Sequence, residues 1–217
     1  MLAWLVLVAG LQPGMVRVAG GEFKPLYAMP GHPVAHVSAF AVDTVPVSQA
    51  QFLAFTRKQP RWSIKGMGAS STLPATRVSW SAAAAYCKAR GARLPTTYEW
   101  EYIARADEKR RDAGGDGSFR QRMLELTMKN RGSNRIGGGL RNIWGVRDLH
   151  GGVFEWTHDY NGHLDSHHKH GASMPHCAAG TVQTGDPSDY AAFMRYSFRS
   201  TADADAGAGN VGFRCAV

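Results

Sequence analysis

The sequence predicts a single α+β domain in which short strands and about three helices are joined by much loop. Three observations support this prediction. Glycine is abundant, at 25 of 217 residues, and six tryptophans can hold irregular backbone in place by burying large rings. Short alternating apolar stretches near the N-terminus are typical of strands. Residues that start and stop helices then follow.

Strand signals lie at both ends of the chain. The stretch 15–23, MVRVAGGEF, indicates a strand, a glycine pair and an edge, and 37–43 continues the alternation. Near the C-terminus, two strand-like stretches flank a loop of small residues. The first begins at Phe193, and the second ends on Gly212-Phe213-Arg214-Cys215.

Helix signals lie between these strands. Ser48 with Gln51 forms a capping box, as does Thr96 with Glu99 at the start of TTYEWEYIARAD. A further helix is predicted over 81–90, ending at Gly91. The segment 118–129 is a weaker candidate for a fourth helix.

The first fourteen residues are predicted to be a leader, followed by one domain over 15–217. Residues 1–11 form an apolar run of signal-peptide length, too short to span a bilayer as a helix, and Gln12-Pro13-Gly14 would break it. No basic residue precedes the run, since the first charge is Arg17. Export, with cleavage or as a short N-terminal anchor, and a buried first strand both remain open. Beyond such an anchor, we expect no integral membrane segment.

The net charge of +8 raises the question of an anionic partner. Between Arg105 and Arg135 there are nine Lys or Arg against five Asp or Glu, but only one aromatic residue, Phe119. The segment also lacks a recognisable nucleic-acid motif. We therefore interpret it as a solvated basic face and expect no nucleic-acid partner.

Several blocks, in order, resemble the formylglycine-generating enzyme family, also called sulfatase-modifying-factor domains. They are MVRVAGGEF, FAVDTVPVSQAQFLAF, VSWSAAAAYCKARGARLPTTYEWEYIARA, NIWGVRDLHGGVFEWTHDY and FRS…NVGFRCA. Together they cover nearly the whole chain after residue 15. The resemblance implies the formylglycine-generating-enzyme fold, a variant of the C-type lectin fold. Charged residues near the aromatic ones, namely Arg93, Glu99 and Glu101, are expected to brace loops.

The resemblance also assigns a disulfide and leaves one cysteine over. Cysteines at positions matching Cys87 and Cys215 form a disulfide in exported members, which agrees with export to the periplasm or the extracellular space. Cys177 follows a histidine-rich run, and soft sulfur and imidazole ligands suit copper or zinc. The candidate copper ligands are Cys177, His176, Met174, His168 and His170. The alternative is a solvated polar loop.

The family's catalytic chemistry is not expected here. Its copper oxidases bind Cu(I) through two cysteines five residues apart, and the matching positions fall near Asp186 and Ala191. Neither residue offers a soft ligand. A calcium loop of the form GNVWEW reads Gly151-Gly-Val-Phe-Glu-Trp, so Gly152 replaces an oxygen ligand, while Glu155 remains a calcium candidate or an anchor for the loop.

Whether the protein is an enzyme therefore stays open. The favoured hypothesis is an exported accessory or binding module that serves a periplasmic copper metalloenzyme, similar in type to the nitrite-reductase accessory members of the family. One alternative is a divergent metal-dependent oxidase acting on thiols from Cys177. The other is a lectin-like binding or immunity protein.

Overall fold

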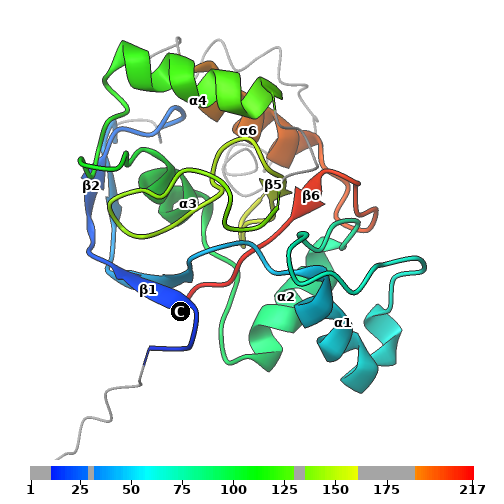
Figure 1. The fold of residues 1–217 in the computed structure, drawn as a ribbon. Helices are drawn as coiled ribbons and strands as arrows, with labels where there is room; N and C mark the ends of the chain where they lie inside the picture. Colours follow the sequence, from blue (N-terminus) through cyan, green and yellow to red (C-terminus); the bar gives the residue numbers. More distant parts are fainter. Residues whose placement is uncertain (1–10, 29–31, 130–134, 161–188) are drawn as a thin grey trace, which may run out of the picture.

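The structure is a computed structural model that describes residues 11–28, 32–129, 135–160 and 189–217. Within them, four short strands form two antiparallel pairs (Figure 1). Strand β1 (Met15–Val18) pairs with β4 (Phe40–Asp43), and β2 (Gly21–Phe23) pairs with β3 (Ala35–Val37). Gly20 and Gly21, the predicted glycine pair, lie where the chain passes from β1 into β2 and crosses the segment after β3. A Cβ on Gly20 would lie 2.5 Å from the carbonyl oxygen of Val37, so this crossing requires glycine.

The predicted capping boxes are present. Helix α1 (Gln49–Lys58) starts at Ser48 with Gln51 as its partner, and α3 (Thr97–Ala104) starts at Thr96 with Glu99. Helix α2 (Trp80–Ala89) ends just before Gly91, whose φ of 70° lies in the left-handed region that glycine favours. These ends follow from contacts within one turn of helix, which explains why the sequence predicts them well.

The described residues contain five α-helices, so the prediction of about three is wrong in number. Besides α1, α2 and α3, they include α4 (Gly117–Lys129) and α6 (Tyr190–Thr201), which pack against each other. Helix α4 corresponds to the weaker helix signal at 118–129.

The prediction of a strand beginning at Phe193 is also wrong, because these residues belong to helix α6. Asp189 caps the helix by accepting from the Ala192 amide at 3.0 Å. The buried side chains recur with helical spacing and include Ala192, Tyr196 and Arg199. Two of the buried residues on α6 are arginines, so the pattern of polar and apolar residues does not indicate which face of the helix is buried.

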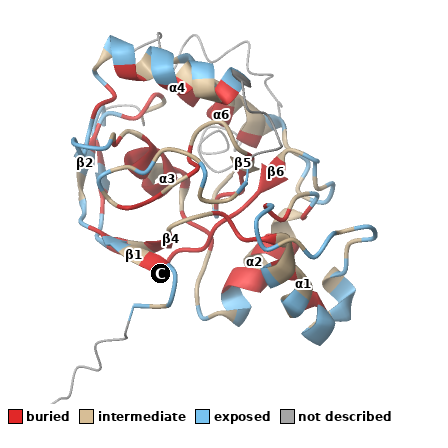
Figure 2. Ribbon diagram, in the orientation of Figure 1, coloured by how far each residue is buried: buried red, intermediate tan, exposed pale blue. Residues whose placement is uncertain are grey.

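The core is arranged around the C-terminal segment, which runs between the helices and the strand pairs (Figure 1). Strand β6 (Val211–Gly212) pairs in parallel with β5 (Phe154–Glu155). Residues 213–216 that follow are all buried, as the red path in Figure 2 shows. This segment continues to β4, where the Val217 amide donates to Ala41. It therefore brings α2, α3, β4 and β5 together.

Residues 1–10 lie outside the described part of the chain, so the leader stays a prediction. Among the described helices, none is long and apolar enough to cross a membrane.

Candidate functional site

The first element of the site is an ion pair at the centre of the molecule. Glu155 on β5 and Arg214 after β6 are joined by hydrogen bonds of 2.7 Å from both Nε and Nη2 of the arginine, and both side chains are 0% exposed. The indole Nε1 of Trp100 donates to the same carboxylate at 2.7 Å. Arg214 also donates to the backbone carbonyls of Asp43 and Arg147. This pair is neutral as a unit and well supplied with partners.

The second element is a buried triad with an excess of positive charge. Glu101 on α3 accepts from Arg195 Nη2 at 2.6 Å and from Arg199 Nη1 at 2.7 Å. All three side chains are at most 7% exposed. Burial by itself would raise the pKa of the Glu101 carboxyl, but the two arginines outweigh that effect and lower the pKa to about 2. Glu101 is therefore ionised, and the triad carries one net positive charge.

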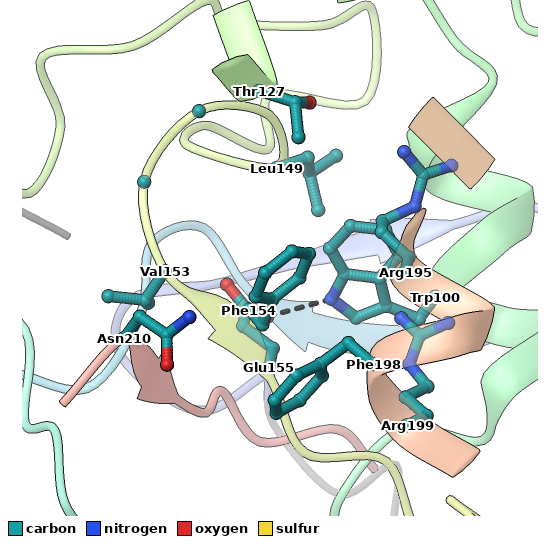
Figure 3. Close-up of a pocket in the computed structure, with 12 residues that line it drawn as sticks. Trp100, Thr127, Leu149, Val153, Phe154, Glu155, Arg195, Phe198, Arg199 and Asn210 are labelled. Atoms are coloured by element: carbon teal, nitrogen blue, oxygen red, sulfur yellow. Dashed lines mark hydrogen bonds between the residues drawn. The ribbon is translucent and has the colours of Figure 1, made fainter. Parts of the chain in front are cut away.

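Trp100 connects the two elements. It precedes Glu101 on α3, and its ring lies against both arginines, with the guanidinium carbons of Arg195 and Arg199 at 5.2 and 4.9 Å from the ring centre. Guanidinium groups stack favourably on such rings. The same indole donates to Glu155 through Nε1, as the dashed line in Figure 3 shows. Trp100 thus holds the neutral pair and the charged triad in one rigid arrangement.

An open pocket lies beside Trp100 (Figure 3). Its volume is about 460 Å³ when the space open to solvent is counted. The two arginines of the triad line one side, and Val153 and Asn210 lie on the opposite side. Phe154 and Phe198 also line the pocket, and their rings stack at 4.6 Å with an angle of 7° between their planes. The pocket therefore combines aromatic surface with cationic groups.

Three buried polar atoms near the triad have no hydrogen-bond partner within the described residues: Nη1 of Arg195, the hydroxyl of Tyr196 and Nδ1 of His150. Burial and then Arg195 lower the pKa of His150 to about 3, so the ring is neutral. Its Nε2 lies 3.0 Å from the Ala104 carbonyl and must be the donor there, which leaves Nδ1 as an acceptor. Burial and then Glu101 raise the pKa of Tyr196 well above its usual value.

The position assigned to the second copper-binding cysteine does not fit copper. Ala191 lies on α6, is 1% exposed, and packs in an apolar cluster with Ala113, Phe119 and Met123. A methyl group in such surroundings cannot ligate a metal. Asp186, the other position, lies outside the described residues.

The described structure contains the predicted calcium ligand but none of the predicted copper ligands. His168, His170, Met174, His176 and Cys177 all lie outside it. No group of three or more His, Cys, Asp or Glu within the described ranges could hold a metal ion. Glu155 is described, and both of its oxygens accept from cationic or indole N–H donors. This setting does not fit calcium, because Arg214 already neutralises the carboxylate.

The structure joins Cys87 on α2 to Cys215 in a disulfide, with 5.5 Å between the Cα atoms. Both cysteines are fully buried in the core cluster around α2. The bridge fixes the C-terminal segment beside α2, and this segment carries Arg214 into its pair with Glu155.

The arginines of the triad are the site residues that the sequence analysis missed. Glu101 was expected to brace loops, and Arg93 and Glu99 do form an ion pair of 2.6 Å near the surface. The i and i+4 spacing of Arg195 and Arg199 could have revealed two cations on one face, but only once the segment was read as a helix.

Comparison with known proteins agrees with this architecture. The model of the "Sulfatase-modifying factor enzyme 1-like domain" matches residues 8–217. The chain is 32% identical to "Inactive C-alpha-formylglycine-generating enzyme 2" of Mus musculus, covering 100% of this chain and 91% of that protein. It is 27% identical to a "Formylglycine-generating enzyme" of Streptomyces coelicolor, covering 94% of this chain and 88% of that protein.

Among solved structures, the chain is similar to that of PvdO from Pseudomonas aeruginosa. The TM-score is 0.56 at 19% identity, with 93% of each chain covered. At this identity the similarity concerns the fold alone. The matched domain model, which spans almost the whole chain, shows that this protein belongs to the sulfatase-modifying-factor, or formylglycine-generating-enzyme, family.

Proposed function

We propose that this chain is a non-oxidising member of the family that works as a binding or accessory module. The observation that carries the proposal is Ala191, a buried methyl group at the position assigned to the second reactive cysteine. A site without thiols there has no soft ligands for Cu(I). The similarity to a mouse relative whose name includes "Inactive" supports the same conclusion.

A binding role is favoured by the pocket beside Trp100. Aromatic surface from Phe154 and Phe198 together with a few fixed polar groups is the usual composition of a ligand site. The cations on its wall are held by Glu101 and by Trp100, so they are in place before a ligand arrives. Binding then requires little ordering of side chains.

The disulfide supports an oxidising compartment. Structural disulfides such as Cys87–Cys215 persist in exported proteins and are rare in the reducing cytosol. We therefore propose export, to the periplasm or the extracellular space. The accessory role for a periplasmic copper metalloenzyme rests on the residues around Cys177, whose sulfur and imidazole groups are of the type that copper prefers.

The oxidation assay tests the proposal directly. The purified chain, supplied with copper, oxygen and a cysteine peptide, is compared by mass spectrometry with the Streptomyces coelicolor relative under the same conditions. We expect formylglycine only in the reaction with the relative. Formylglycine formed by this chain above the enzyme-free background would refute the proposal.

Metal analysis tests the copper-related part. We expect about one copper per chain in the protein and its loss in Cys177→Ala, with Cys87 and Cys215 left intact as the disulfide. Absence of copper from both samples would overturn the copper role and would favour the lectin-like alternative. Bound copper together with thiol-dependent oxygen consumption would favour the divergent oxidase instead.

A further inference from the structure

We propose that the pocket beside Trp100 binds the carboxylate of a monoanionic ligand whose apolar part lies against Phe154 and Phe198. This inference deepens the proposed binding function and rests on it. Two independent observations carry it: an excess of positive charge among the described side chains of the pocket wall, and a buried hydrogen-bond donor that has no partner among the described residues.

The charge count comes from five buried ionised side chains. Glu155 and Arg214 cancel each other, whereas Glu101 faces both Arg195 and Arg199, which leaves one positive charge. An unpaired charge away from water is costly, and a bound ion of opposite sign removes that cost. Because the five side chains carry a net charge of +1, a ligand with a single negative charge balances them better than a doubly charged phosphate.

Among the described residues, Asp189 is another acid that acts on Arg195, but it does not supply the missing negative charge. Asp189 is only half-buried, and its Oδ1 accepts from the Ala192 amide as the helix cap. Solvent therefore weakens its effect on the guanidinium. Arg122, which also acts on His150, pairs with Glu108 near the surface and does not change the charge count. The region as a whole thus favours an anion.

The unused donor belongs to Arg195. Its Nε and Nη2 atoms both bind Glu101, so in a planar guanidinium Nη1 projects from the opposite edge. Nη1 is buried and has no partner among the described residues. Arg199 donates to Glu101 through Nη1 and lines the same pocket. A planar carboxylate can accept from both guanidinium groups, whereas a neutral amide of the same shape brings a competing donor.

The apolar part of the ligand is specified by the remaining walls. Phe154 and Phe198, whose rings stack on each other, line the pocket together with Val153 and Leu149 (Figure 3). An aromatic or branched acid buries apolar area there while its carboxylate reaches the arginines. The carboxylate could come from a small free acid or from the end of a peptide.

The experiment uses benzoate and its neutral match benzamide. Binding to the full chain is measured by calorimetry and by tryptophan fluorescence, since Trp100 borders the pocket. We expect benzoate to bind about tenfold or more tightly than benzamide, as expected for hydrogen bonds to a charged group. The preference should weaken with added salt. Equal binding of the two probes, or stronger binding of phosphate than of benzoate, would overturn the proposal.

Three variants locate the binding. Arg195→Gln removes the unused donor and the net charge while leaving Glu101 paired with Arg199, and we expect benzoate affinity to fall at least about tenfold. Phe198→Leu keeps all charges, and we expect weaker binding with the preference for benzoate retained. Arg17→Gln removes an exposed charge on β1, away from the pocket, and should change nothing. Circular dichroism checks that each variant is folded. Unchanged affinity in folded Arg195→Gln would refute the assignment.

A second pair of probes identifies the source of the carboxylate. Acetyl-Gly-Phe with a free C-terminus is compared with the same peptide carrying a C-terminal amide. Tighter binding of the free acid than of benzoate would assign the site to a peptide end, and the reverse would assign it to a small acid. If no formylglycine forms in the oxidation assay and neither acid binds, this inference fails while the proposed non-oxidising function stands.

Discussion

Replacing Glu101 by glutamine should destabilise this protein more than any surface change, because it breaks the buried triad on one side only. Glu101 accepts four hydrogen bonds from two arginines, the shortest being 2.6 Å to Arg195 Nη2. Glutamine keeps the size of the side chain, but it is neutral, and its amide nitrogen would meet a guanidinium donor. Two buried positive charges would then lack a counterion.

The size of the effect can be worked out in two ways. Breaking a buried ion pair by removing one partner costs about 3–5 kcal/mol. Independently, the pKa of Glu101 falls from 4.5 to about 2 on folding, and this difference corresponds to about 3 kcal/mol of stability at neutral pH. We therefore expect a loss of about 3–4 kcal/mol in the free energy of unfolding. For a chain of this length, this lowers the melting temperature by about 6–16 °C.

The assay is urea unfolding followed by tryptophan fluorescence and circular dichroism, with the disulfide intact. Glu99→Gln is the matched control, because Glu99 is also on α3 and also pairs with an arginine, but that arginine is 41% exposed. Glutamine at this position keeps the capping box, so a loss of about 1 kcal/mol or less is expected. If Glu101→Gln were no more destabilising than Glu99→Gln, the account of the triad would be wrong.

The remaining predictions concern acid, the disulfide and the strand crossing. His150 is neutral in the fold, with a pKa of about 3 against 6.5 when unfolded, so stability should fall as pH drops below about 6.5, and Glu101 should add to the loss below about 4.5. His150→Leu should remove the first part of this loss in acid titrations followed by fluorescence, and an unchanged profile would contradict the assignment. Cys87→Ala with Cys215→Ala should cost about 2–5 kcal/mol in urea unfolding. If the wild type were as unstable as this double variant and had three reactive thiols, the bridge would be shown not to form. Gly20→Ala should lower stability by about 1–3 kcal/mol, since its Cβ would meet backbone atoms at 2.5 and 2.7 Å; Gly115→Ala, with open space around the Cβ, should not.

The sequence predicted those features that depend on neighbours along the chain. The two capping boxes and the glycine stop after α2 involve residues no more than a few positions apart, so their hydrogen bonds can be foreseen from spacing alone. The order of the blocks that resemble the family likewise identified the family and, with it, the fold. The absence of thiols before the C-terminal segment was also visible in the letters themselves.

The prediction for α6 failed for a physical reason. A buried helical face is normally recognised by apolar residues at helical spacing, but here Arg195 and Arg199 occupy that face. Their burial is possible only because Glu101 lies opposite, and it is 94 and 98 residues away in the chain. No local pattern contains this information.

By itself, therefore, the sequence determined the family, the starts of α1 and α3, the end of α2 and the loss of the reactive cysteine positions, since each depends on residue identity or short-range bonding. Only the tertiary structure decided where the charge resides. It paired Glu155 with Arg214, which leaves no setting for calcium at that carboxylate. It also set two arginines against one glutamate beside an aromatic pocket. The electrostatics of a buried group depends on which side chains surround it in space, and that arrangement exists only once the chain has folded.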